Sequence, residues 1–383
     1  MAKVSILMPA CNVEKFIREC MDSVVKQTLE DIEIICLNDG SKDMTGVILD
    51  EYAEKYPTVK VIHKPNSGYG HSMNVGLQHA TGEYIGVVET DDWAELDMFE
   101  KLYEVAKKCD ADIVKANYFT YVTNPEPKSE YFEVLEPYAD LYNKVFKPSE
   151  ERNHEVFKVR PCIWSGIYKR QMLLDNQVWF SETPGASYQD TGFAFKAWTS
   201  AERAVLVKDA YLHYRIDNAN SSVKSAAKIF CICDEYDAID KYLAERPEKK
   251  AQLERLEVAH KFQSYLWNFR RLTMEFRYAF LLQMHKEFAQ AREDGLLDKK
   301  YFNDYLWKNL TLVLDDMDDF YKKECKKYLV EFQTVSEMSK AYKQQKKNVE
   351  KLEKEVKKVR TCNSYKIGRV VTYIPRKIKQ VLK

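Results

Sequence analysis

The stretch Gly86–Trp93 reads GVVETDDW, an apolar run that stops at three acidic side chains within four residues. The short apolar run over Tyr84–Val88 is typical of a buried strand. Glu89, Asp91 and Asp92 follow it directly. Carboxylates this close repel one another and lose hydration when buried, unless positive charge neutralises them. The stretch therefore predicts a buried strand whose end carries concentrated negative charge.

Strand-like and helix-like segments alternate on both sides of this stretch, over residues 4–116. The strand-like segments are apolar throughout, which indicates strands buried on both faces. Helices between such strands favour a mostly parallel sheet covered by helices, an α/β fold. The expected strands are Val4–Met8, Ile32–Leu37, Val59–His63, Tyr84–Val88 and Ile113–Ala116. The expected helices are Lys15–Gln27, Met44–Lys55, Ser72–His79 and Leu96–Lys108.

Polar clusters follow three of these strands. They are Asn38–Ser41, Asn66–Gly68 and Glu89–Asp92. The carboxyl ends of parallel strands meet at one edge of the sheet, where ligands bind in folds of this kind. A dinucleotide-binding fold would carry a Gly-rich turn after its first strand, but Pro9–Asn12 contains no glycine. The sequence therefore predicts a polar site of another type at this edge.

Hard carboxylate oxygens at a strand end suit Mg²⁺ or Mn²⁺, which take one or two carboxylates and leave other positions to phosphate and water. A cation held there would neutralise the acidic cluster and could clamp a diphosphate. The alternative is that Asp91 or Asp92 caps the helix expected to begin near Leu96.

The remainder of the chain reads differently. Residues 120–160 are rich in proline and charge, with a strand expected at Tyr131–Leu135 and a buried one at Cys162–Tyr168. From 226 to 332 the pattern is helical, and its apolar stripe indicates a helical core. The stripe consists of Phe262, Tyr265, Leu266, Phe269, Leu272 and Phe276. We therefore expect three parts: a catalytic α/β domain over 1–222, a helical domain over 223–334 and a basic tail over 335–383.

The amino-acid composition bears on where the protein acts and on its partners. The nine cysteines show no paired metal-ligand spacing, which indicates a reducing compartment. No apolar run approaches the roughly 18 residues of a membrane-spanning helix, and the N-terminal apolar run is too short for a signal peptide. We expect no nucleic-acid partner.

The tail carries 15 Lys and Arg against four Glu between residues 337 and 383. Val335, Tyr342, Val349 and Val356 recur every seven residues, which predicts a short coiled coil and a homodimer through 335–360, with a single solvated helix as the alternative. Residues 365–383 form a basic amphipathic pattern typical of helices that bind anionic membrane surfaces. Docking on the protein's own body or on a partner is the alternative there.

Two ordered segments carry a resemblance to a known family. VSILMPACNVEKFIRECMDSVVKQTLEDIEIICLNDGSKDMT, over Val4–Thr45, and NSGYGHSMNVGLQHATGEYIGVVETDDW, over Asn66–Trp93, resemble the amino-terminal half of family 2 glycosyltransferases. The resemblance covers residues 3–120 closely and 160–222 more loosely. It implies the nucleotide-diphospho-sugar transferase fold of the glycosyltransferase A type and an inverting sugar transfer.

The resemblance also implies roles on the donor side. Asp39, in LNDGS, matches the aspartate that hydrogen-bonds the uracil ring, and Pro9 and Ala10 match the loop lining that base pocket. Arg215, in HYR, matches a residue contacting the diphosphate. The other implied donor-binding residues are Asn66, Gly68, Asn74, Glu89 and Thr90.

Glu89-Thr90-Asp91 occupies the family's D-x-D position, with glutamate in place of the first aspartate. The resemblance makes Asp91 the direct ligand of Mn²⁺ or Mg²⁺ and lets Glu89 reach the ribose or a metal-bound water. It implies His213 as a further metal ligand, with a hydrogen-bonded core histidine as the alternative.

The segment SYQDTGFAFKAW, over Ser187–Trp198, resembles the family segment that carries the catalytic base. Asp190 occupies the position of the base, and Gln189 replaces a glutamate. Both Gln189 and Trp164 are implied on the acceptor side, although a core tryptophan is equally consistent with the pattern. Asp190 as a helix N-cap is the alternative, and nearness to a helix N-terminus would lower its pKa.

These patterns predict an inverting, metal-dependent, non-processive glycosyltransferase that uses a nucleotide-diphosphate sugar, UDP-linked by expectation. Its acceptor would be a hydroxyl of a glycan or lipid-linked molecule in bacterial surface-polysaccharide synthesis. The chain would act in the cytoplasm, peripherally on the inner face of the cell membrane. The main alternative is a non-catalytic nucleotide-sugar-binding or scaffold subunit of such a complex. A nucleotidyltransferase is a third possibility, which normally requires a Gly-rich loop after the first strand.

Overall fold

The computed structural model describes the chain except for residues 1, 125, 219–228, 326–342, 353 and 356–383. The membrane-binding segment predicted at 365–383 lies outside the described residues, as does most of the coiled coil predicted at 335–360. The chain divides into two compact units, residues 1–260 and 261–383.

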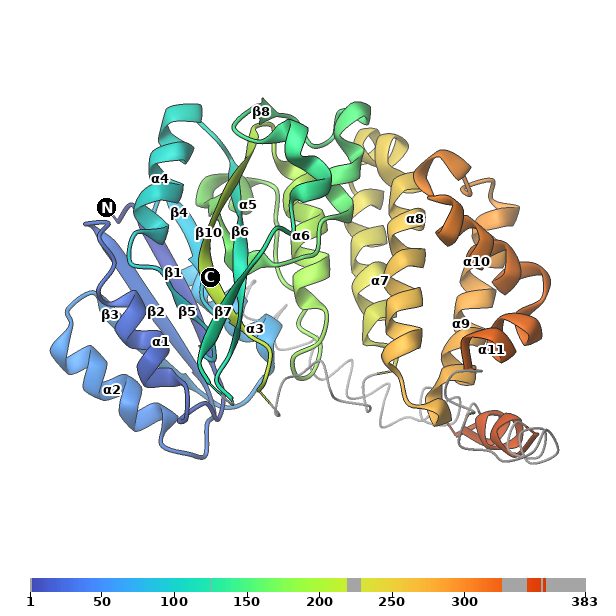
Figure 1. Ribbon diagram of the computed structural model, residues 1–383, viewed down its shortest axis with the longest axis horizontal. Coiled ribbons are helices and arrows are strands. Elements are labelled where there is room, and N and C mark those ends of the chain that lie inside the picture. The colour runs from blue at the N-terminus through green and yellow to red at the C-terminus, as the bar shows by residue number, and fades with distance from the viewer. Residues whose placement is uncertain (1, 125, 219–228, 326–342, 353, 356–383) are drawn as a thin grey trace, which may run out of the picture. The chain divides into compact units, whose positions relative to one another are not determined.

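The first unit is built on a sheet with the strand order β3-β2-β1-β4-β9-β6-β10-β5 (Figure 1). The neighbours β1, β2, β3 and β4 run parallel, as do β6 and β10. The strands are β1 (Val4–Ala10), β2 (Ile32–Asp39), β3 (Val59–Lys64), β4 (Tyr84–Val87), β5 (Trp93–Ala94), β6 (Ile113–Val122), β7 (Lys128–Phe132), β8 (Val145–Phe146), β9 (Gly166–Lys169) and β10 (Ala204–Arg215). All seven residues of β1 are buried, as expected for a strand covered on both faces. The α/β fold predicted from the alternating pattern is confirmed.

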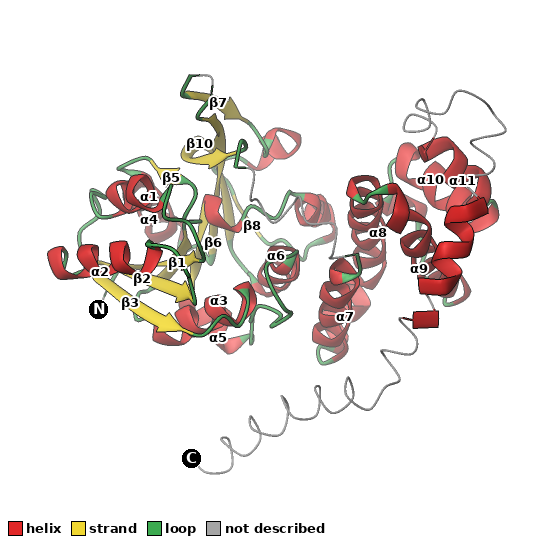
Figure 2. Cartoon of the chain, turned by 90° about the horizontal axis from the view of Figure 1, so that it is seen from below, coloured by secondary structure: helices red, strands yellow, loops and turns green. Residues whose placement is uncertain are grey.

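Helices cover this sheet on both sides. In Figure 2, α1 (Ile17–Val24), α2 (Thr45–Lys55) and α4 (Met98–Cys109) lie on one side of the strands, with α3 (Tyr69–His79) and α5 (Arg170–Asp175) on the other. The four helices expected from sequence are all present, with ends shifted by a few residues.

The middle of the chain departs from its prediction. Instead of a strand over Cys162–Tyr168, a short 3₁₀ turn at Ile163–Ser165 leads into β9. Strand β9 runs antiparallel to both β4 and β6, so the sheet is mixed. The strand expected at Tyr131–Leu135 is shifted toward the N-terminus and forms β7, which pairs with β6 and is exposed along its whole length.

The register of the parallel strands brings their carboxyl ends together. Ala10 lies opposite Asn38, Asp39 lies opposite Lys64, and Leu7 lies opposite Val87. The three polar clusters that follow β2, β3 and β4 therefore meet at one edge of the sheet, as the alternating sequence predicts.

Helices α6 (Gln189–Ser200) and α7 (Cys231–Ala244) pack against each other, so the first unit extends beyond the boundary expected at residue 222. Gly192 permits this packing, because a Cβ there would lie 2.3 Å from Glu235 Oε2. Helix α8 (Pro247–Arg271) crosses the division between the two units.

The described part of the second unit is mostly helical. It contains the end of α8, then α9 (Met274–Glu293), α10 (Asp304–Asp315) and α11 (Met317–Cys325). The predicted apolar stripe is buried from Phe262 to Leu272, which confirms a helical core, whereas Phe276 lies in α9 and is partly exposed. Residues 343–352 are also helical. There Val349 is buried and Gln345 Oε1 accepts a 2.9 Å hydrogen bond from Tyr321, so this part of the predicted coiled coil contacts its own chain.

No helix among the described residues is both long enough and apolar enough to span a bilayer.

A buried carboxylate joins the amino-terminal ends of the central strands. Glu33 in β2 is 5% exposed and accepts hydrogen bonds from Ser5, from Thr81 and from the ammonium of Lys60. Burial by itself raises the pKa of Glu33, but these hydrogen bonds outweigh it and lower the pKa to about 2. The carboxylate thus stabilises the fold in its ionised form.

Because the folded pKa of Glu33 is depressed, its contribution is complete above pH 4.5 and is lost as the pH falls toward about 2. We expect Glu33→Gln to remove up to about 3 kcal/mol of acid-sensitive stability. Urea unfolding at pH 7 and at pH 3 measures this, with Glu54→Gln on the exposed face of α2 as control. Equal losses on acidification in wild type and Glu33→Gln would contradict the assignment.

Candidate active site

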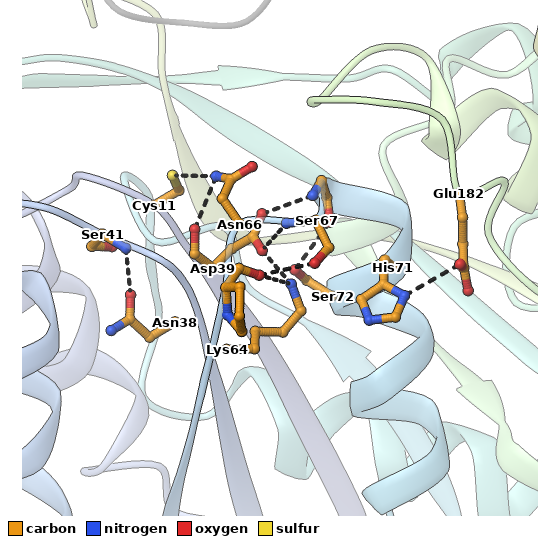
Figure 3. A network of polar contacts seen from close by, with 12 residues as sticks. Cys11, Asn38, Asp39, Ser41, Lys64, Asn66, Ser67, His71, Ser72 and Glu182 are labelled. Carbon is orange, nitrogen blue, oxygen red and sulfur yellow. Dashed lines mark hydrogen bonds and ion pairs between the residues drawn. The ribbon is translucent and has the colours of Figure 1, made fainter. Parts of the chain in front are cut away.

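Asp39, at the end of β2, organises the loop that follows β3. One of its carboxylate oxygens accepts a hydrogen bond from the backbone N–H of Ser67 at 2.8 Å and forms an ion pair with Lys64, and the other accepts from the N–H of Gly68 at 3.1 Å (Figure 3). The carboxylate is buried, and the Asp39 carbonyl accepts a further bond from Asn66. Two carboxylate oxygens offer about four lone-pair positions. Lys64, Ser67 and Gly68 use three of them, so one position on the Asp39 carboxylate remains.

Gly68 lies where two loops meet. Its φ is +89°, and a Cβ there would lie 3.0 Å from the nitrogen of Gly185 and 3.0 Å from the carbonyl of Thr183. The next residue, Tyr69, donates its backbone N–H to the Gly185 carbonyl at 2.9 Å. Glycine at position 68 therefore allows the loop held by Asp39 to contact the segment that precedes α6.

The end of β1 is tied to the acidic segment. Thr90 donates its hydroxyl to the Pro9 carbonyl at 2.7 Å, and both Thr90 and Ala10 are buried. Of the residues expected around the base pocket, Pro9 and Ala10 thus lie beside the cluster that begins at Glu89.

The acidic cluster contains buried carboxyl groups that the protein satisfies only in part. Asp92 is 1% exposed; its Oδ1 accepts from the backbone N–H of Arg215 at 2.8 Å, and its Oδ2 has no hydrogen-bond partner within the described structure. Burial, and then repulsion from Asp91, raise the pKa of Asp92 well above its usual range. Asp91 Oδ2 accepts a 2.8 Å hydrogen bond from the Asn218 amide.

Glu89 is the third carboxyl group of this cluster. It accepts a 2.6 Å hydrogen bond from the Tyr69 hydroxyl. Burial raises its pKa to about 8 despite that bond, and repulsion from Asp91 and Asp190 adds to the effect. The alternative of a helix cap is wrong for Asp91 and Asp92, because α4 begins at Met98 and Asp97 stands at its N-cap.

The donor atoms present fit a hard divalent cation. The cluster offers carboxylate oxygens, one of them a buried oxygen without a partner, and its raised pKa values reflect charge that a cation would offset. Within the part of the chain that the structure describes, no group of three His, Cys, Asp or Glu side chains could hold a metal by itself. A cation on Asp91 would therefore need further ligands from water and phosphate.

His213, expected as a metal ligand, has other partners. Its Nε2 contacts Glu95 Oε1 at 2.8 Å and its Nδ1 contacts the Ser129 hydroxyl at 2.7 Å. The imidazole is stacked between the rings of Trp93 and Phe119. Both ring nitrogens are thus used within the protein, as the hydrogen-bonded alternative predicts, and His213 does not belong to the candidate metal site.

Arg215, expected at the diphosphate, is also used within the protein. Its guanidinium pairs with Glu19 and donates to the Asp91 carbonyl and the Thr123 hydroxyl. The side chain is 2% exposed and packs near the rings of Phe16 and Tyr121. Its bond to the Asp91 carbonyl holds the acidic segment in place, and because the side chain is buried it offers little surface to a ligand.

Asp190 lies in the first turn of α6, and Tyr188, in the left-handed region with φ +62°, occupies the N-cap. The N-cap alternative for Asp190 is therefore wrong, although its Oδ1 accepts from the N–H of Thr191. Burial raises the pKa of Asp190 to about 6, which overturns the expected lowering by the helix N-terminus. The carboxyl group is partly exposed and close enough to Glu89 for the two to repel each other.

Two other predicted residues hold the neighbouring loops. Gln189 is 1% exposed; its amide donates to Thr183 and to the Gly185 carbonyl. Asn74 on α3 donates to the Phe180 carbonyl and to Glu182, and accepts from the Phe180 N–H. Both side chains position the segment that leads into α6.

Trp164 is buried and its ring is stacked on that of Tyr214 at 5.1 Å.

Three residues of this region were not predicted from the sequence. Tyr69 holds Glu89 through its hydroxyl. Lys115, buried in β6, donates to the Cys162 carbonyl and the Ser165 hydroxyl, and its charge opposes the rise in the pKa of Asp190. Arg160 acts on Asp190 in the same direction. A lysine inside the apolar run IVKAN was a usable signal, whereas nothing local marked Tyr69 or Arg160.

The first unit has a fold similar to the glycosyltransferase A type. Residues 5–167, less than half of the chain, match the family model described as Glycosyl transferase family 2.

Several curated relatives are named as glycosyltransferases. The chain is 34% identical over 227 residues to the "Uncharacterized glycosyltransferase EpsJ" of Bacillus subtilis (strain 168), covering 57% of this chain and 62% of EpsJ. It is 31% identical over 218 residues to the poly(ribitol-phosphate) beta-glucosyltransferase of Bacillus spizizenii, covering 56% of this chain and 32% of that protein. The chain thus spans less than two thirds of these relatives.

Among solved structures, S. aureus TarS 1-349 in complex with UDP-GlcNAc is similar, with a TM-score of 0.54 and 19% identity over 85% of this chain and 91% of that one. At this identity the similarity concerns the fold.

We expect Asn74→Ala to lower the free energy of unfolding by about 1–3 kcal/mol, because it leaves the buried N–H and carbonyl of Phe180 without their partner. Chemical unfolding measures the loss, and limited proteolysis should show earlier cleavage within 180–188. Gln171→Ala, which removes only an exposed bond to Asp175, is the control. An Asn74→Ala protein as stable as wild type would exclude this positioning role.

Proposed function

We propose that this chain is an inverting, metal-dependent glycosyltransferase that transfers one sugar from a nucleotide-diphosphate donor to a hydroxyl group. The observation that carries the proposal is that Asp190 lies close enough to Glu89, the first residue of the acidic cluster, for the two carboxyl groups to repel each other. A general base and an acidic cluster that fits a cation are the two elements that such a transfer requires.

On the donor side, the loop held by Asp39 would bind the nucleotide base, with Pro9 and Ala10 beside it. The open position on Asp39 suits an N–H donor such as that of uracil. A UDP-sugar is therefore the first donor to test, and the UDP-GlcNAc complex of the TarS structure supports that choice. Asn66 and Gly68 would act by shaping this loop, and Asn74 by holding the segment that leads into α6, rather than by touching the donor.

On the acceptor side, Asp190 would take the hydroxyl proton while the acceptor oxygen bonds to the anomeric carbon and the bond to the diphosphate breaks. A carboxylate with a pKa of about 6 is mostly ionised at neutral pH and is a stronger base than an ordinary aspartate. Gln189 and Trp164 would support the acceptor side indirectly. A cation on Asp91 would supply positive charge for the leaving diphosphate.

The acceptor would be a glycan or lipid-linked hydroxyl compound of a bacterial surface polysaccharide. The name of the B. spizizenii relative, a poly(ribitol-phosphate) beta-glucosyltransferase, supports this acceptor class. The basic segment 365–383 would place the enzyme at the cytoplasmic membrane surface, and salt-sensitive binding to anionic vesicles tests that placement.

If the cation and donor bind together, UDP should bind tightly only with Mn²⁺, and Asp91→Ala should weaken that binding at least tenfold, since it removes the expected ligand. Isothermal titration of UDP, GDP, CDP and dTDP with and without Mn²⁺ measures this, with Asp97→Ala as the matched control. If a nucleotide binds equally well without Mn²⁺ and to Asp91→Ala, the acidic cluster has a structural role and does not hold a cation for the donor.

Asp190→Asn should leave UDP binding unchanged while lowering transfer by about 10²–10⁴-fold, the usual contribution of a general base. In wild type, kcat/KM should fall as the pH drops through about 6, because the base must be ionised. Release of UDP from a panel of UDP-sugars measures both. Unchanged turnover in Asp190→Asn would remove the proposed base, and donor binding without any turnover in wild type would favour the scaffold alternative.

A further inference from the structure

Arg160 presents a guanidinium group with unused donors beside the proposed site. It is exposed, donates one hydrogen bond to the Tyr118 hydroxyl at 3.1 Å and lies 5.8 Å from the centre of the Tyr214 ring. Tyr118 and Tyr214 both contact the buried ring of Trp164. The aromatic rings thus orient Arg160 while leaving most of its five donors available.

Other arginines of the first unit are occupied differently. Arg18 pairs with Glu51, Arg152 with Glu150, and Arg215 with Glu19. Within the described structure, no carboxylate oxygen lies within 4 Å of the Arg160 guanidinium. An arginine that is oriented yet unpaired is suited to an anionic ligand, because its planar fork matches the oxygens of phosphate.

The position of Arg160 places that ligand at the reaction site. Tyr214, which Arg160 overlies, precedes Arg215, whose backbone N–H binds Asp92. The charge of Arg160 also lowers the pKa of the Asp190 carboxyl group. Arg160 therefore lies near the proposed base and contacts Tyr214, which is itself close enough to Asp91 and Asp92 to feel their charge.

We propose that Arg160 binds a phosphate group of a substrate at the reaction site, through paired N–H···O contacts held in place by Tyr118 and Tyr214. The inference rests on the proposed function for the identity of the substrate. The phosphate belongs either to the diphosphate of the donor or to a phosphate on the acceptor, and the two sources can be separated by experiment.

The test is isothermal titration of wild type and Arg160→Ala with two probes. One probe is UDP in the presence of Mn²⁺, and the other is sn-glycerol 3-phosphate, with glycerol as its neutral control. Because charge-assisted bidentate contacts are lost, we expect about tenfold or greater weakening for one of the two phosphate probes. Arg160→Lys should recover part of this, since it restores the charge without the fork. Arg152→Ala, an exposed arginine nearby, is the matched control.

A loss confined to UDP assigns the phosphate to the donor, and a loss confined to glycerol 3-phosphate assigns it to the acceptor. Equal affinities of Arg160→Ala and wild type for both probes overturn the proposal, while UDP binding by wild type would leave the proposed function standing. Conversely, if glycerol 3-phosphate binds in an Arg160-dependent manner and no nucleotide binds, the phosphate site at Arg160 is supported and the proposed function fails. If neither probe binds wild type, both proposals fail. Should Arg160→Ala lower the unfolding midpoint, Arg160→Gln, which keeps a donor for Tyr118, takes its place.

Discussion

The burial of several carboxyl groups at one edge of the sheet is the constraint on which the rest of this site depends. Asp92 carries a buried oxygen without a partner, and Glu89 has a raised pKa beside it. The surrounding structure holds these groups in place: Tyr69 hydrogen-bonds Glu89, Thr90 ties the segment to β1, and Arg215 donates to the Asp91 carbonyl. Such an arrangement is costly for stability alone, and it is understandable if a cation completes it.

Much of the fold could be predicted because it depends on local patterns. Apolar runs identified the parallel strands, and since the carboxyl ends of such strands share an edge, the alternation alone predicts that Asp39 and Asp91 lie together. Strand β9 could not be predicted in the same way. Its direction depends on pairing with β4 and β6, which lie far away in the chain, and four apolar residues give no sign of orientation.

The sequence predicted which acidic side chains lie at the site, but it was less successful for the basic side chains. A motif identifies which residue types reach the edge, but not which partners they meet there. Arg215 forms an ion pair with Glu19, 196 residues earlier in the chain, and His213 is hydrogen-bonded to Glu95 and Ser129. The pKa of Asp190 shows the same limit: its position at a helix start follows from the sequence, but burial depends on tertiary neighbours and outweighs the helix dipole.

The contact between Gly68 and the Gly185 segment links two loops that lie more than a hundred residues apart in sequence. One loop is anchored by Asp39 and the other leads directly into the helix of Asp190. Neither loop can lengthen, or gain a side chain at position 68, without displacing the other. Variants of this protein should therefore change the two loops in concert, so that the two sides of the candidate site do not diverge independently in its evolution.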